Sequence, residues 1–101
     1  MDKLKMLLES TGFPVAYHHF AEGECPEPPF ICYFSLNSQN FFADNKVHYS
    51  KNSYIVELYT DKKQPIIEHE IESVLSEYGW EKNETYIETE RLYQIIYEIE
   101  V

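Results

Sequence analysis

The chain has 101 residues, of which 26% are charged, and its net charge of −10 at pH 7 is typical of one acidic globular domain, 1–101. Because its eight basic residues include a single arginine, Arg91, the sequence lacks the clustered cations that neutralise nucleic-acid phosphates or dock on anionic membranes. The longest apolar run, FICYF at 30–34, is far too short to cross a membrane, and no signal-peptide pattern is visible, so we expect a soluble, cytoplasm-made protein.

The chain begins with a predicted helix and a predicted strand. Three leucines within 4–8 are spaced i, i+3, i+4, which is typical of one apolar face of a helix. Gly12 and Pro14 follow, as residues that close a helix commonly do. The alternating segment 15–20 then predicts a short strand.

The middle of the chain is predicted as strands separated by loops. Three prolines and three glutamates indicate a loop over 21–29. A strand is expected over 30–36, followed by a turn over 37–40 and by a short extended piece and a loop over 41–53. The clearest strand of this part is 54–60, because its apolar residues alternate.

A second helix is predicted from Pro65 to Gly79. Its apolar residues recur at helical spacing and should form the buried stripe: Ile67, Ile71, Val74, Leu75 and Tyr78. Its charged residues are expected on the solvent face: Glu68, His69, Glu70, Glu72 and Glu77.

Two strands, about 80–88 and 92–101, complete the chain with a turn at Thr89 and Glu90. The last strand alternates, with one face expected to carry Tyr93, Ile95, Tyr97, Ile99 and Val101. The resulting order, α-β-β-β-α-β-β, predicts an α+β domain of two layers. In it a mainly antiparallel sheet carries both helices on one face.

The histidine pair is the first candidate for a metal site. In a strand over 15–20, His18 and His19 would point to opposite faces and could not converge on one ion. We therefore expect no metal and no cofactor.

The candidate catalytic groups lack a supporting context. Cys25 and Cys32 are separated by six residues, which matches no common zinc or redox spacing. Glu98 and Glu100 share a strand face, which is more typical of a solvated surface than of paired catalytic carboxylates. We expect no catalytic residues and no enzymatic activity.

Two features suggest an interface. Phe41 and Phe42 lie among turn-forming residues beside Asp44 and Asn45, so their rings either tuck into the core or anchor a partner.

The second feature is on the last strand. Leu92 and Ile96 interrupt its otherwise polar face, and a neighbouring subunit would cover them if both helices pack on the opposite face.

Several segments resemble small proteins of tailed bacteriophages and prophages of Gram-positive bacteria. They are GFPVAY at 12–17, PPFI at 28–31, FADNKV at 42–47, YIVELYTDKK at 54–63 and TYIETERLYQIIYE at 85–98. They are distributed along the chain from residue 12 to residue 98, and the resemblance extends over nearly the whole chain. The chain is similar to tail-completion, tail-terminator and head–tail joining proteins.

The resemblance implies a structural protein of the virion neck or tail end. Such a subunit forms a homo-oligomer, for which a hexameric ring is one form, and binds tail-tube or head-connector proteins without contacting nucleic acid directly or a membrane. It would assemble in the host bacterial cytoplasm. Acidic residues facing the DNA channel would repel the passing phosphates.

The charge leaves two other interpretations open. A net charge of −10 can serve solubility alone. It can also belong to an acidic DNA mimic that inhibits a host DNA-processing enzyme, although mimics usually arrange their carboxylates in long rows.

Overall fold

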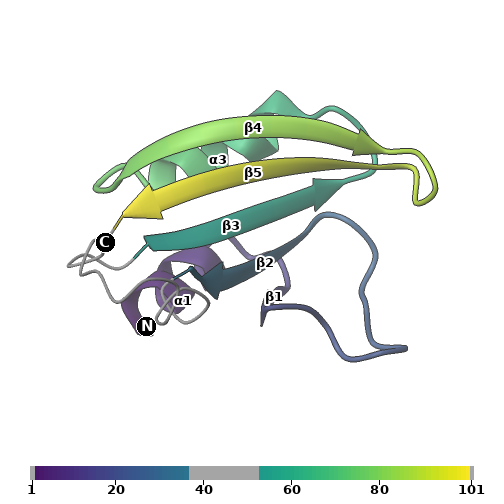
Figure 1. The fold of residues 1–101 in the computed structure, drawn as a ribbon, viewed down its shortest axis with the longest axis horizontal. Coiled ribbons are helices and arrows are strands. Elements are labelled where there is room, and N and C mark those ends of the chain that lie inside the picture. The colour runs from purple at the N-terminus through teal and green to yellow at the C-terminus, as the bar shows by residue number, and fades with distance from the viewer. Residues whose placement is uncertain (1, 37–52, 101) are drawn as a thin grey trace, which may run out of the picture.

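A computed structural model describes residues 2–36 and 53–100 (Figure 1). Within these residues the elements follow the predicted order, α-β-β-β-α-β-β. The elements are α1 (Asp2–Glu9), β1 (Val15–Tyr17), β2 (Phe30–Ser35), β3 (Ser53–Thr60), α3 (Pro65–Val74), β4 (Gly79–Ile87) and β5 (Leu92–Glu100). The turn expected over 37–40 and the extended piece and loop over 41–53 lie outside these residues, apart from Ser53.

The strands form one five-stranded sheet in the order β1-β2-β3-β5-β4. The pairs β2–β3, β3–β5 and β4–β5 are antiparallel, and only the short β1 runs parallel to its neighbour β2. The predicted α+β class with a mainly antiparallel sheet is therefore confirmed.

One face of the sheet forms the core together with the two described helices. Leu4 and Leu8 of α1, Ile71 of α3 and Leu75, the residue that caps the end of α3, belong to a single buried cluster. The strands contribute the residues that alternate toward this side: Ile31, Tyr33, Tyr54, Val56, Leu58, Ile95, Tyr97 and Ile99. Burial of these large side chains is the main stabilising contribution to the fold.

Two predicted boundaries are wrong. The strand expected over 15–20 ends at Tyr17, because His18 has a φ of 70° and leaves the extended region. The second helix ends at Val74, five residues earlier than predicted. The residues after it form turns, in which Tyr78 N–H donates to the Leu75 carbonyl at 2.9 Å. Gly79 then begins β4.

The strands β4 and β5 form a long hairpin whose tip lies at one end of the molecule (Figure 1). The turn covers residues 88–91, where Arg91 N–H donates to the Glu88 carbonyl at 3.3 Å. Arg91 has a φ of 56°, a left-handed conformation that non-glycine residues adopt mostly as single residues in turns.

Candidate functional site

The residues predicted as an interface fall into two groups. Phe41, Phe42, Asp44 and Asn45 lie outside the described residues. Leu92 and Ile96 are half-buried on β5, on the sheet face opposite α1 and α3. The predicted alternation of the last strand is thus confirmed over Leu92–Glu100.

We call this second side of the sheet the distal face. Its central residues alternate with the core residues along β2, β3 and β5: Phe30, Cys32, Phe34, Ile55, Glu57, Tyr59, Leu92, Gln94 and Ile96. Most of these side chains are half-buried, whereas Phe30 and Cys32 are buried. The face is therefore more apolar than an ordinary solvated sheet surface.

Aromatic rings surround β2 on the distal face. His18 stacks on Phe34 with ring centroids 5.3 Å apart, and Phe30 stacks on Tyr59 at 4.9 Å. Phe20, in the segment after β1, meets Phe30 edge-on at 5.5 Å. The chain that leaves β1 thus folds back over this side of the sheet. His18 packs on a ring instead of extending a strand, which corrects the reason we gave for excluding a metal there.

A polar chain crosses the middle of the distal face. Gln94 Nε2 donates to the Tyr59 hydroxyl oxygen at 2.9 Å, and the Tyr59 hydroxyl donates to Glu57 Oε1 at 3.0 Å. Burial raises the pKa of Glu57, although the Tyr59 hydrogen bond and nearby His18 act in the opposite direction. Burial also raises the pKa of Tyr59, and the Glu57 charge adds to that effect.

The Glu57 carboxylate can accept further hydrogen bonds. A carboxylate can accept about four hydrogen bonds, and within the described chain Glu57 accepts one, from Tyr59. Its register neighbours Cys32 and Ile96 give it apolar surroundings. This arrangement suits the binding of a cationic group, since a cation would compensate a charge that burial disfavours.

Cys32 lies beside Glu57 on this face. Burial, with a smaller contribution from Glu57, raises the pKa of its thiol to about 11. The thiol is therefore protonated at neutral pH, which disfavours nucleophilic chemistry. Cys25 is exposed in the loop before β2.

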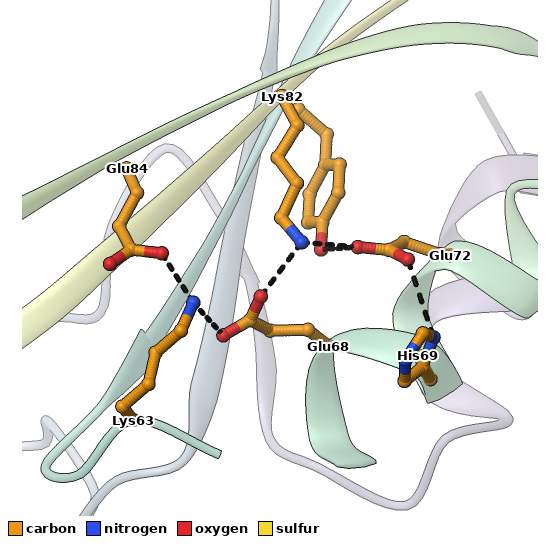
Figure 2. A network of polar contacts seen from close by, with 7 residues as sticks. Lys63, Glu68, His69, Glu72, Lys82 and Glu84 are labelled. Atoms are coloured by element: carbon orange, nitrogen blue, oxygen red, sulfur yellow. Dashed lines mark hydrogen bonds and ion pairs between the residues drawn. The ribbon is translucent and has the colours of Figure 1, made fainter. Parts of the chain in front are cut away.

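A second polar cluster lies between α3 and β4 (Figure 2). Glu68 Oε2 accepts a hydrogen bond from Lys63 Nζ at 2.6 Å, and Glu68 Oε1 forms an ion pair with Lys82 Nζ at 2.7 Å. Lys82 Nζ also contacts Glu72 Oε2 at 2.7 Å, and Lys63 contacts Glu84.

This cluster corrects the predicted solvent face of the second helix. The Glu68 side chain is 4% exposed and that of Glu72 15%, whereas His69, Glu70 and Glu77 are exposed as predicted. The Tyr97 hydroxyl donates to Glu72 Oε2 at 2.8 Å and so extends the network into the core. The cluster is fully paired, so it fastens β4 to α3 and offers no free group for chemistry.

A surface hollow of about 520 Å³ lies between the end of α1 and the outer side of α3. Its lining includes Thr11, Ile66 and His69, and Ile66 is 77% exposed. The hollow is therefore open to solvent and does not have the enclosed shape of a small-molecule site.

The described part of the chain contains no group of three or more His, Cys, Asp or Glu side chains placed to hold a metal ion. None of the helices that the structure describes is long and apolar enough to cross a membrane. Comparison with known protein families, curated proteins and solved structures gives no match.

Proposed function

We propose that this protein is a structural subunit of a tailed phage, acting at the head–tail neck or at the tail end. In this role it oligomerises, as a ring, to complete the tail and join it to the capsid. The assignment to a virion rests on the resemblance of segments such as 54–63 and 85–98 to phage tail-completion and joining proteins. The assignment to an assembly role rests on the distal face.

The observation that carries the assembly role is the half-buried apolar surface opposite α1 and α3. Leu92 and Ile96 lie there with Phe34 and Ile55, at the positions where a solvated sheet would carry polar side chains. Subunit contacts that bury such a surface gain stability from the hydrophobic effect.

The proposed partners are further copies of this chain and the proteins of the tail tube or the head connector. The acidic charge of −10 suits a component that DNA passes without binding, because carboxylates repel phosphates. In this proposal the subunit has no catalytic activity, no cofactor and no membrane contact. It assembles in the bacterial cytoplasm and ends at the neck or tail end of the particle.

An acidic DNA mimic is the competing proposal, and the ion pairs of α3 weigh against it. Glu68 and Glu72 are engaged by lysines within the fold, so they do not project from the helix as phosphate analogues. Glu70 on the helix and Glu77 in the turn after it do not form a long row, and Glu77 pairs with Lys3.

The test is a double substitution on the distal face, Leu92→Glu with Ile96→Glu. We expect the folded variant to have a lower oligomer mass by light scattering than the wild-type protein, because each added carboxylate would have to be desolvated in a subunit contact. Ile66→Glu adds a charge at a position that is 77% exposed on α3 and serves as the control. An unchanged oligomer mass in the double variant would argue against this face as the assembly surface.

A further inference from the structure

The tip of the β4–β5 hairpin carries the only arginine of the chain. Arg91 is exposed at the end of the turn, next to Leu92, and its left-handed conformation is part of that turn. Within the described chain it has no carboxylate partner. Arginine is favoured at protein interfaces, because its planar guanidinium binds carboxylates with two hydrogen bonds and stacks on aromatic rings.

The other basic residues are mostly used within the fold. Lys3 pairs with Glu77, and Lys63 and Lys82 hold the α3–β4 cluster. Among the basic residues that the structure describes, only Lys5, Lys62 and Arg91 lack an ion-pair partner there. Arg91 differs from the two lysines in standing at a protruding turn with an apolar neighbour.

The distal face carries a matching acceptor. Glu57 is half-buried, accepts one hydrogen bond from Tyr59 and has no cationic hydrogen-bond partner among the described residues. The stacked pairs Phe30–Tyr59 and His18–Phe34 lie on the same face. A guanidinium that reaches Glu57 would therefore meet both a carboxylate and ring surfaces.

We infer that Arg91 of one copy binds Glu57 on the distal face of a second copy of this chain. The inference deepens the proposed function and rests on its homo-oligomeric part. The contact joins two different surfaces, the hairpin tip and the distal face, so it is heterologous and can be repeated around a ring.

Leu92 and Ile96 lie on opposite sides of this contact, one on each of the two surfaces that it joins. Leu92 follows Arg91 at the tip, and Ile96 is the register neighbour of Glu57 on the accepting face. Apolar contact around the ion pair would exclude water, and that strengthens an electrostatic interaction.

The test is charge reversal, read as the dissociation constant from sedimentation equilibrium. Glu57→Arg and Arg91→Glu each place like charges in the contact, and we expect each variant alone to associate about 30-fold or more weakly than the wild-type protein. In an equimolar mixture each contact between the two different variants regains opposite charges, so association is expected to return through assemblies in which the variants alternate. The neutral variants Glu57→Gln and Arg91→Gln test the same contact with little risk to folding.

Matched controls separate this pair from general charge effects. Lys62→Glu repeats the charge change of Arg91→Glu, and Glu70→Arg on α3 repeats that of Glu57→Arg on the side of the sheet opposite the distal face; both positions are exposed. We expect the controls to associate like the wild-type protein and unlike the reversed pair.

The outcomes distinguish the two proposals. If the wild-type protein oligomerises and neither reversal weakens it, the Arg91–Glu57 contact is refuted while the assembly role stands. Equal weakening by the controls, or no recovery on mixing, also refutes the specific pair. A wild-type protein that stays monomeric at high concentration overturns the contact and the self-assembly on which it rests.

Discussion

At the scale of single residues, Glu68 is the most deeply buried charged group that the structure describes. A buried carboxylate is costly unless it is paired, and here two lysines approach it from different segments. Lys63 precedes α3 and Lys82 lies on β4, so the carboxylate links the start of the helix to an edge strand. Both lysine side chains remain partly exposed, at 41% and 33%.

We expect Glu68→Ala to lower the free energy of unfolding by about 2 kcal/mol, because it removes charge-assisted hydrogen bonds and leaves both lysines without this partner. Glu70→Ala removes an exposed glutamate of the same helix and should change stability by less than about 0.5 kcal/mol. Urea denaturation of the two variants at neutral pH measures both values. Equal effects would show that the cluster does not stabilise the fold.

The ion pairs of Glu68 with Lys63 and Lys82 also make the free energy of unfolding depend on pH. Burial raises the pKa of Glu68, but the hydrogen bonds from Lys63 and Lys82 outweigh it and hold this pKa below 4.5. The unfolded chain therefore takes up this proton at a higher pH than the folded chain does, and the free energy of unfolding falls as the pH drops below about 4.5.

Denaturation of the wild-type protein and of Glu68→Gln across the acidic range checks this prediction. The stability advantage of the wild-type protein should be complete at neutral pH and should narrow as the pH falls through the folded-state pKa of Glu68. Glu57, whose pKa is raised, is present in both proteins and cancels in the difference. If the difference in free energy of unfolding between the two proteins stays constant with pH, the assigned role of Glu68 is contradicted.

At the scale of elements, α3 holds the two layers together. Ile71 and Leu75 are fully buried against the sheet, while Ile66 on the outer side is 77% exposed. β4 has the opposite character, since most of its side chains are exposed and it lies at one edge of the described sheet. Its charged residues Glu81, Lys82 and Glu84 are typical of edge strands protected from unwanted pairing.

Ile71→Ala should lower the free energy of unfolding by about 2–5 kcal/mol, the usual loss when a large aliphatic side chain is removed from a core. Ile66→Ala, on the same helix, should change the free energy of unfolding by less than about 0.5 kcal/mol, because the side chain is exposed and the two residues differ little in helix propensity. Denaturant melts of both variants provide the comparison. A loss below about half a kcal/mol at Ile71 would mean that this stripe is not the core face.

At the scale of the whole molecule, the net charge determines how the protein interacts with DNA. With eighteen acidic residues, eight scattered basic ones and a single arginine, the sequence has no basic stripe whose binding to phosphates would release counterions from DNA. Some of the basic residues are in addition engaged in ion pairs within the fold, namely Lys3, Lys63 and Lys82.

We therefore expect no measurable binding to duplex DNA at physiological salt in a gel-shift assay, and no inhibition of nucleases or polymerases. Tight inhibition of such an enzyme would favour the DNA mimic over the structural subunit.

A phage without this protein should fill its heads with DNA and yet produce separated heads and tails, or tails of abnormal length, because the joining step is missing. Electron microscopy of the particles measures this outcome. Normal infectious particles would remove the proposed structural role.

The sequence by itself determined the helices, most strands and their faces, because side-chain periodicity is a local property. The stripe of Ile67, Ile71 and Leu75 and the alternation of β5 needed no knowledge of their partners. Local conformation already misled at His18, where a left-handed residue ends β1 inside an alternating pattern.

The tertiary structure decided which segments meet. Glu68 lies three residues before Ile71, inside the apolar stripe, and its charge alone suggested a solvated position until Lys63 and Lys82 were seen to neutralise it. In the same way, the alternation of 54–60 put Glu57 and Tyr59 on one face, but only the pairing of β3 with β5 brought Gln94 to them. Burial of a polar group depends on partners distant in sequence, and local periodicity carries no information about those partners.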